Sequence, residues 1–325
     1  MDGDVKGTGA TIDHSSRYLI GVDLGTTNSV VAYIDTQESA VEGSSGIRVL
    51  EVPQLVGPGE VRALPHLPSF LYFPLESEIA SGTLALPWDE QPSSIAGTMA
   101  REQGALLPGR QVSSVKSWLC QGAVDRTADI LPVEAEPSAP KVSPVEASAR
   151  YLMHLRNAWN YAMAADKARN PEQLFENQEI VLTVPASFDE EARELTVEAA
   201  RRAGIENLTL LEEPLAAFYA WIAQHRHAIH DHVQDGDLVL ICDIGGGTSD
   251  FSLVRARLHA EEMEFERTAI GDHLLLGGEN LDLALARLVE QKVKAKLSFR
   301  QRRALQVAAS VAKERLLSEA EIDRL

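Results

Sequence analysis

The chain has 325 residues, which is enough to bury a sizeable core and suggests two domains. Its formal net charge of -18 argues against binding to nucleic acid or to an anionic membrane surface, and no apolar run is long enough to span a membrane. The two cysteines, Cys120 and Cys242, form no disulfide framework, so the composition favours a reducing cytoplasm. Cys242 lies in an apolar run that we expect to be a buried strand, which makes it a small core residue.

The N-terminal part of the chain predicts a polar arm, a β-hairpin and a loop-rich insert. Residues 1–16 contain no hydrophobic segment and no export-signal layout, so we expect a disordered arm there. Residues 17–35 predict the hairpin, and about 40–115 the loop-rich insert. In and directly after the insert we expect a strand over 47–52, a proline-rich loop over 52–92 with a short strand over 69–73, a Gly/Pro loop over 104–110, and a short helix or turn around Lys116.

The middle of the chain alternates helices and strands, after a Pro- and Ala-rich connection over 125–144 that we expect to be exposed. Ser143 and Pro144 are a good N-cap and first-turn pair for a helix that carries Trp159 on its apolar face. Further on we expect a strand over 179–184, a helix over 188–203 that ends at Gly204, a strand over 208–211, and a helix from Pro214 to Ala223. This order predicts a right-handed crossover between two parallel strands.

The chain divides into a first lobe over 17–229 and a second lobe over 230–325. The second lobe begins near Gly236 with a hairpin. Two helices are expected after it, an amphipathic one over 279–297 and another over 300–317.

A Gly-rich turn between two apolar strands occurs twice, at 21–29 and at 242–250, with Asp23 and Asp243 each ending a first strand. Glycines let the backbone approach a ligand closely, N–H groups and threonine hydroxyls suit phosphate oxygens, and carboxylates suit Mg²⁺ and its waters. Two facing turns of this kind predict a clamp for a nucleoside triphosphate between two lobes built by duplication. The residues of the two turns that we expect to contact phosphate are Gly25, Thr26, Thr27, Asn28, Gly245, Gly246, Gly247 and Thr248.

Several candidate residues also have ordinary structural interpretations. Asp23 and Asp243 could simply begin turns, although the repeated context favours phosphate and metal binding. Glu213, before Pro214, suits a helix cap or a carboxylate that enters the cleft and positions a metal-bound or attacking water; the residues alone leave both open. By composition alone Lys116 is a surface lysine.

Two further segments carry weaker signals. Gly277, Gly278 and Glu279 begin a predicted helix, where a simple turn is one interpretation and free N–H groups that suit phosphate are the other. A polar stretch is rich in possible metal ligands, but their spacing matches no zinc pattern. These ligands are His225, His227, His230, Asp231, His232 and Asp235. The chain has no P-loop and no dinucleotide fingerprint.

These motifs together resemble the nucleotide-binding domain of the DnaK-type heat-shock chaperones, within the actin-like ATPase superfamily. The resemblance runs in family order from about residue 17 to the end, and it implies a two-lobed α/β fold with duplicated ribonuclease H-like sheets and flanking helices. The segment at 211–217, Leu-Glu-Glu-Pro-Leu-Ala-Ala, resembles the family's Asn-Glu-Pro-Thr-Ala-Ala. The similar segments are the phosphate loops at 21–29 and 243–250, Val-Pro-Ala-Ser-Phe at 184–188, Glu-Glu-Pro-Leu-Ala-Ala at 212–217, and Leu-Gly-Gly-Glu-Asn-Leu-Asp at 276–282.

The resemblance also implies roles for single residues. Asp23 and Asp243 would hold waters of a Mg²⁺ ion that bridges the β- and γ-phosphates, and Lys116 would be the catalytic lysine that stabilises charge on the γ-phosphoryl group. Glu213 and Asp250 would position metal-bound water, K⁺ or the attacking water. The other implied roles are phosphate contact by Thr26, Thr27 and Thr248, nucleotide contact by Gly277, Gly278, Glu279, Lys313 and Ser318, and a relay through Pro185 and Arg193 toward a peptide-binding domain.

The chain departs from the family pattern near the expected adenosine site. Ser310 stands where the family has Glu, Glu314 where it has Arg, and Ser117 where it has Arg. The resemblance therefore supports adenine binding less than phosphate binding. The chain ends before the family's second adenosine loop, so we expect a second lobe that is truncated at its C-terminus, without the peptide-binding domain or its lid.

The leading hypothesis is that a monomeric, cytoplasmic chaperone domain binds ATP or ADP with Mg²⁺, hydrolyses ATP slowly, and closes its lobes. Unfolded peptide clients and co-chaperones would bind through regions beyond this chain. A filament-forming ATPase of the bacterial-actin type is the first alternative. A sugar kinase, for which no catalytic Asp or sugar pocket is identified, and a relative that binds nucleotide without hydrolysing it are the others.

Overall fold

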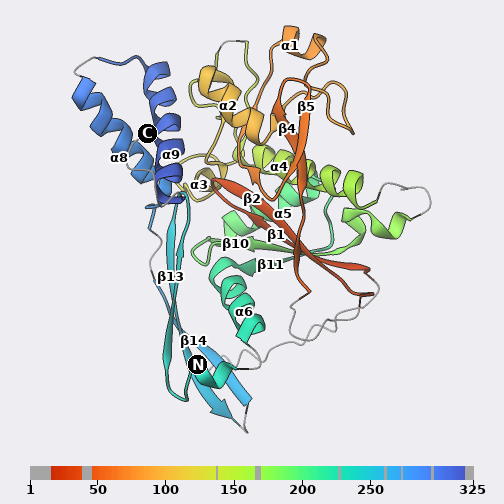
Figure 1. Ribbon diagram of the computed structural model, residues 1–325, viewed down its shortest axis with the longest axis vertical. Helices are drawn as coiled ribbons and strands as arrows, with labels where there is room; N and C mark the ends of the chain where they lie inside the picture. Colours follow the sequence, from red (N-terminus) through yellow and green to blue (C-terminus); the bar gives the residue numbers. More distant parts are fainter. Residues whose placement is uncertain are drawn as a thin grey trace.

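The structure is a computed structural model that describes residues 16–38, 46–136, 138–164, 170–225, 228–259, 262–271, 274–293 and 296–318. The arm expected over 1–16 lies outside the described residues, except for Ser16. Figure 1 shows the predicted α/β fold, in which a three-stranded sheet and two long helices lie beside a larger sheet with its own helices. None of the described helices is both long and apolar enough to cross a lipid bilayer.

The larger sheet has the strand order β11-β10-β1-β2-β3, and β6 also pairs with β2. Its strands are β1 (Tyr18–Leu24), β2 (Asn28–Asp35), β3 (Arg48–Val49), β6 (Leu67–Pro68), β10 (Glu179–Val184) and β11 (Leu208–Glu212). The hairpin expected over 17–35 is confirmed as the antiparallel pair β1 and β2. The predicted parallel pair is β10 and β11, and β1 also runs parallel to β10, so the ends of these three strands meet at one edge of the sheet.

Helix α4 (Pro144–Ala162) packs against two other helices of this half, α3 (Val115–Leu119) and α5 (Glu190–Arg202). The Ser143 hydroxyl accepts a hydrogen bond from the Glu146 N–H at 3.1 Å, which confirms the predicted N-cap of α4. Gly204 follows α5 with a φ of 76°, a left-handed conformation that ends the helix where the sequence predicts.

Trp159 of α4 is fully buried at the centre of the main core. Its ring meets Tyr18 and Tyr33 edge-on with centroids 5.2 Å away, and Phe175 at 5.9 Å. Its indole N–H donates to the carbonyl of Gln173 at 2.9 Å, so the polar atom is satisfied as well. The helix thus holds the β1–β2 hairpin through one side chain.

Replacing Trp159 by alanine should lower the free energy of unfolding by about 3–5 kcal/mol, because the change opens a large cavity and removes the ring contacts. Urea unfolding followed by circular dichroism measures this change. Tyr161 on the same helix is 50% exposed, and its alanine variant should cost less than about 1 kcal/mol. Equal losses for the two variants would contradict the central position of Trp159.

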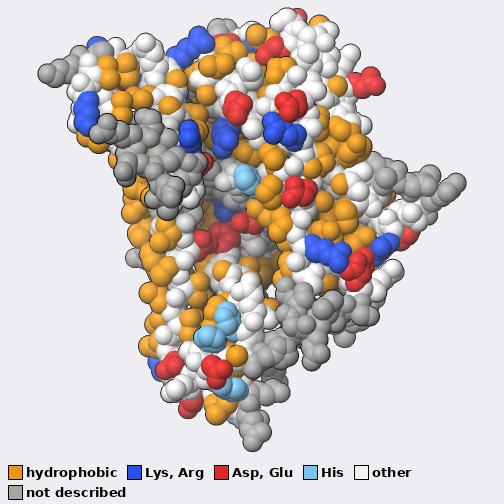
Figure 2. Space-filling model, in the orientation of Figure 1, with side chains coloured by type: hydrophobic (Ala, Val, Ile, Leu, Met, Phe, Trp, Pro, Cys, Tyr) orange, Lys and Arg blue, Asp and Glu red, His pale blue; other side chains and the backbone are white. Residues whose placement is uncertain are grey.

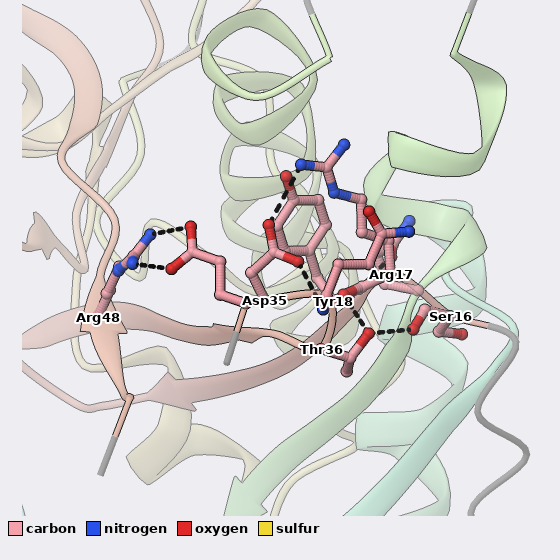
Figure 3. A network of polar contacts seen from close by, with 9 residues as sticks. Ser16, Arg17, Tyr18, Asp35, Thr36 and Arg48 are labelled. Carbon is pink, nitrogen blue, oxygen red and sulfur yellow. Dashed lines mark hydrogen bonds and ion pairs between the residues drawn. The ribbon is translucent and has the colours of Figure 1, made fainter. Parts of the chain in front are cut away.

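A polar network fastens the start of β1 to the end of β2 (Figure 3). Arg17 donates to Asp35 at 3.2 Å, and the Thr36 hydroxyl donates to the carbonyls of Arg17 at 2.8 Å and Ser16 at 3.2 Å. The Arg17 guanidinium also lies 5.0 Å from the centre of the Tyr18 ring. The network closes the end of the hairpin opposite its Gly-rich turn and so fixes the strand that leads into that turn.

The insert expected over about 40–115 contains more regular structure than its prolines indicate. Leu55, Tyr72 and Met99 are buried in a small core of its own. The prediction of a loop over 104–110 is wrong in part, because α2 continues through Gly104 to Leu106. The Gln111 side chain packs against Gly104. The elements are β4 (Val52–Gly57), β5 (Glu60–Leu64), β7 (Leu71–Tyr72), which confirms the short strand, β8 (Ile95–Ala96), β9 (Gln111–Val112), α1 (Glu76–Ala80), α2 (Thr98–Leu106) and a 3₁₀ turn, Pro108–Arg110.

The connection over 125–144 is partly buried, so the expectation that it is exposed is wrong for several residues. Leu131 and Val142 pair through an isolated β-bridge and are only 2% and 4% exposed, because their side chains complete the main core. Arg126 is buried too, and its guanidinium holds both carboxylate oxygens of Asp189, at 2.9 and 2.8 Å.

The second sheet has the order β12-β13-β14 and is antiparallel throughout. The hairpin expected after Gly236 is confirmed, whereas its third strand was not predicted. Helix α6 (Glu213–His225) contacts β10 and β11 of the larger sheet and β12 and β13 of this one, so it joins the two halves. The remaining strands and α-helices are β12 (Leu238–Ile244), β13 (Ser249–His259), β14 (Glu262–Ile270), α7 (Ile229–His232), α8 (Gly278–Val293) and α9 (Phe299–Ser318). Two 3₁₀ turns, Pro171–Gln173 and Phe175–Asn177, precede β10.

Cys242 is exposed, so the prediction that it is a core residue is wrong. Among the described strands β12 pairs with β13 alone, and the side chains on the same face as Cys242 are open: Leu240 is 60% and Ile244 69% exposed. An apolar run predicts a strand, but only packing decides whether a face of that strand is covered. Figure 2 shows hydrophobic side chains along the side where Figure 1 draws this sheet.

Candidate functional site

The two Gly-rich turns face each other across a cleft. Each turn joins two antiparallel strands, β1 to β2 in one half and β12 to β13 in the other. A Cβ atom at Gly246 would collide with the Thr27 hydroxyl, and one at Gly247 would lie 2.9 Å from the Thr26 methyl group and 2.7 Å from the Ser117 hydroxyl. The turns therefore approach each other so closely that side chains at these glycines would not fit.

The cleft has a volume of about 490 Å³. Figure 2 shows Asp and Glu side chains gathered in the hollow between the two halves. The lining residues include eleven that the sequence singled out, and they come from both halves of the molecule: Asp23, Gly25, Thr26, Thr27, Asn28, Lys116, Glu213, Asp243, Gly245, Gly246 and Thr248. Thr183, Ala216, Ala217, Ile241 and Cys242 also line it.

Thr183 is a site residue that the sequence analysis missed. It is aligned with Asp23 in the parallel pair of β1 and β10, and its hydroxyl donates to the Asp23 carboxylate at 3.0 Å. The signal that could have identified it is the predicted crossover, because parallel strands end at the same edge of a sheet.

Lys116 is buried and forms an ion pair with Glu213 in the cleft. The interpretation of Lys116 as a surface lysine is therefore wrong; the short helix α3 points it into the cleft wall. Glu213 is the first residue of α6, directly after β11, and it too lines the cleft. Of the two interpretations that the sequence left open for Glu213, the structure favours the carboxylate that enters the cleft.

The electrostatics of the cleft are dominated by carboxylates around this one ammonium group. Burial by itself would lower the pKa of Lys116, but Glu213, Asp23 and Asp243 together raise it, so the lysine stays charged. Burial raises the pKa of Glu213 to about 7, against the opposing effect of Lys116 and with added repulsion from Asp23 and Asp243. Burial also raises the pKa of Asp243. The cleft thus carries more negative charge than its own lysine neutralises.

The raised pKa of Glu213 predicts a pH dependence of stability. The folded chain binds the Glu213 proton more tightly than the unfolded chain, so this residue's contribution to stability is complete below pH 4.5 and is lost as the pH rises to about 7. The free energy of unfolding of wild type, relative to Glu213→Gln, should fall by up to about 3 kcal/mol across that window. Urea titrations at several pH values measure it; a difference that does not change with pH would contradict the burial of this carboxyl group.

The donor set fits a hard cation that keeps part of its water shell. Asp23, Glu213 and Asp243 line the cleft, and Asp250 is buried opposite Asp243 in the β12–β13 pair. In the described part of the chain no three His, Cys, Asp or Glu side chains lie close enough together to hold a metal ion by themselves. Carboxylates that surround a cleft without converging on one point suit Mg²⁺ bound through water and phosphate.

The loop at 277–279 supports the second turn rather than lining the cleft. The N–H groups that we expected to be free are used: Gly278 donates to the Gly245 carbonyl at 3.0 Å and Glu279 to the Gly246 carbonyl at 2.8 Å. The Glu279 carboxylate accepts a hydrogen bond from the Ser114 hydroxyl at 2.7 Å, which ties this loop to the start of α3. The expected direct contact with phosphate therefore has no free donor at these two positions.

Lys313 and Ser318 of α9 do not line the cleft either. Lys313 pairs with Asp282 at 2.7 Å and donates to the Gly278 carbonyl at 3.2 Å. Ser318 is exposed, and its hydroxyl donates to the Glu314 carbonyl of its own helix at 2.7 Å. In this structure the side chains of Lys313 and Ser318 thus make hydrogen bonds and an ion pair within the second half.

The histidine-rich stretch makes ring contacts. His225 and His232 meet edge-on with centroids 4.6 Å apart, and Trp221 stacks on His225 at 4.7 Å. His227 lies outside the described residues.

Comparison with known proteins agrees with this geometry. The Hsp70 protein family matches residues 91–323. The chaperone protein HscA homolog of Cupriavidus necator is 32% identical over 318 residues, which cover 93% of this chain and 42% of that protein. The HscA homolog of Haemophilus influenzae (strain PittEE) is 29% identical over 324 residues, with 95% and 44% covered. The chain thus spans about two fifths of the length of these curated relatives.

Proposed function

Because the chain belongs to the Hsp70 family, we propose that its cleft binds ATP with Mg²⁺ and hydrolyses ATP slowly, as the nucleotide-binding domain of a DnaK-type chaperone. One observation carries the proposal: the two Gly-rich turns and the Lys116–Glu213 pair line the same cleft, although they lie far apart in the sequence. The Hsp70 match supports this function over the filament-forming alternative.

Phosphoryl transfer to water needs little more than positioning and charge stabilisation. Backbone N–H groups of both turns, with the hydroxyls of Thr26, Thr27 and Thr248, would hold the phosphate oxygens. Lys116 would stabilise the negative charge that spreads over the γ-phosphoryl oxygens in the transition state. Because Lys116 is charged and already fixed by its carboxylate neighbours, it needs little reorganisation to do this.

Glu213 would orient the attacking water and accept its proton. The oxygen of that water forms a bond to the γ-phosphorus, the bond to the β–γ bridging oxygen breaks, and ADP and phosphate leave. Its raised pKa of about 7 suits a base that works near neutral pH. Asp23, Asp243 and Asp250 would hold Mg²⁺ through its waters, and the ion when bound would neutralise phosphate charge.

Closure of the two halves around nucleotide would be relayed to a peptide-binding domain, as the resemblance to the DnaK-type chaperones implies. The nucleotide-binding domain would be monomeric and would work in the cytoplasm. Unfolded peptide clients and co-chaperones would bind through regions beyond this chain, which only the family resemblance supports.

Single-turnover hydrolysis of radiolabelled ATP by the full 325-residue chain tests the proposal. We expect slow release of phosphate that requires Mg²⁺ and stops when EDTA is added. Nucleotide that binds without phosphate release would instead identify a sensor that no longer hydrolyses. Sedimentation of the chain with ATP tests the filament-forming alternative, which requires a pellet that depends on nucleotide.

A further inference from the structure

Glu212 lies directly before the cleft residue Glu213, and its carboxylate is held between two arginines. Arg193 donates to one oxygen at 3.1 Å, and Arg267 donates to the other. The Glu212 side chain is only 16% exposed, whereas the arginines are 25% and 33% exposed. The carboxylate is therefore mostly withdrawn from water and depends on both guanidinium groups for its hydrogen bonds.

The two arginines come from different halves of the molecule. Arg193 belongs to α5, beside the larger sheet, and its guanidinium also donates to the Phe188 carbonyl at 3.3 Å. Arg267 belongs to β14, where it is aligned with Val254 of β13. Glu212 itself ends β11. The carboxylate thus connects the second sheet to the strand end and the helix of the first half.

The sheet that Arg267 anchors is the sheet that carries Asp243. Strand β14 pairs with β13, β13 pairs with β12, and β12 ends at the second Gly-rich turn. On the other side of the Arg267–Glu212 contact, the residue that follows Glu212 is Glu213, which pairs with Lys116. One ion bridge therefore lies between the two sets of cleft residues.

We propose that Glu212 is a positioning residue. Its ion pair with Arg267, called the tether below, joins the β12–β14 sheet to the first half and keeps the turn after Asp243 in place opposite Glu213 and Lys116. Opening of the cleft by rotation of the second half then has to break the Arg267–Glu212 contact. This inference rests on the proposed nucleotide binding, because the tether acts by holding the cleft closed around the ligand.

The physical chemistry sets the size and the signature of the effect. A partly exposed ion pair contributes little to global stability, but a contact that breaks only when the halves separate acts fully on the rate of separation. Since both arginines are partly exposed, salt weakens the contact. The tether should therefore change the rate of ligand release and the salt dependence of that rate, with little effect on unfolding.

The test is release of N-methylanthraniloyl-ADP, with Mg²⁺, from the full chain in a stopped-flow instrument. Arg267→Gln should speed release about three- to tenfold at low salt. A factor of this size corresponds to the free energy of one partly exposed ion pair. Raising the salt concentration should speed release from wild type and have much less effect on the variant. Arg257→Gln is the matched control, because Arg257 lies on the neighbouring strand and pairs only loosely with Glu266, at 3.8 Å within the same sheet.

A second variant removes the other partner of the ion pair, so the proposal can still be tested if Arg267→Gln does not fold. Glu212→Asn, which introduces the residue usual in the resembled segment, should speed release as well, and the double variant should release no faster than the faster single one. Thermal unfolding of each variant checks the fold. If wild type binds no N-methylanthraniloyl-ADP, the proposed function fails; if it binds but Arg267→Gln and Arg257→Gln release at the wild-type rate, the tether is overturned.

Discussion

Replacing Lys116 with alanine is expected to lower the rate of single-turnover ATP hydrolysis by a factor of about 10²–10³. Among the described residues that line the cleft, Lys116 is the only lysine or arginine, and it is buried in contact with Glu213. Charge that develops on the γ-phosphoryl group would otherwise face three lining carboxylates, Asp23, Glu213 and Asp243, with only the metal ion to oppose them. Quenched-flow measurement of phosphate release at saturating Mg-ATP gives the rate directly.

The control for this variant is Lys141→Ala, because Lys141 is an exposed lysine away from the cleft. It should hydrolyse ATP at the wild-type rate. Removal of Lys116 leaves Glu213 buried without its partner, so the pKa of Glu213 should rise further and the carboxyl group should protonate rather than unfold the chain. Hydrolysis by Lys116→Ala at the rate of Lys141→Ala would contradict the assignment of the catalytic lysine.

Replacing Gly277 with alanine should weaken nucleotide binding about tenfold or more, although Gly277 does not line the cleft. A Cβ atom there would lie 2.5 Å from the Gly246 carbonyl oxygen and 2.6 Å from that of Gly245. Both atoms are backbone, so either the second Gly-rich turn or the start of α8 has to shift, and the hydrogen bonds between them are then disturbed. Isothermal titration with Mg-ADP measures the loss of affinity.

The neighbouring residue provides the comparison for this variant. A Cβ atom at Gly278 would meet first the ammonium end of Lys313, at 3.3 Å, which can move aside. Gly278→Ala should therefore change the affinity less than about threefold. Equal effects of the two substitutions would indicate that any side chain at this helix start disturbs the site, and would contradict the role of Gly277 as the support of the turn.

The sequence predicted best where the chemistry is local. The β1–β2 and β12–β13 hairpins, the N-cap at Ser143, the helix end at Gly204 and the parallel pair β10–β11 all follow from turn residues and apolar periodicity within short segments. The insert was harder to predict, because Pro and Gly signal loops while the short strands and α2 depend on a small core that forms only after folding.

The candidate site divides in the same way. Its glycines, threonines and aspartates were identified because they repeat a pattern whose chemistry is fixed by residue type. Lys116 was identified through resemblance alone, since nothing in its local sequence shows that packing buries it beside Glu213. Thr183 was missed, because its place next to Asp23 depends on which strands pair.

The sequence by itself determined the kind of site: two Gly-rich turns with acidic strand ends, suited to phosphate and a hard cation, on an α/β framework. The tertiary structure decided which side chains those turns work with. It placed Glu213 in the cleft, engaged Gly278 and Glu279 in support of the second turn, and left Cys242 exposed. The reason is that turn geometry and strand periodicity act over a few residues, whereas burial and charge pairing depend on contacts between segments that only the fold brings together.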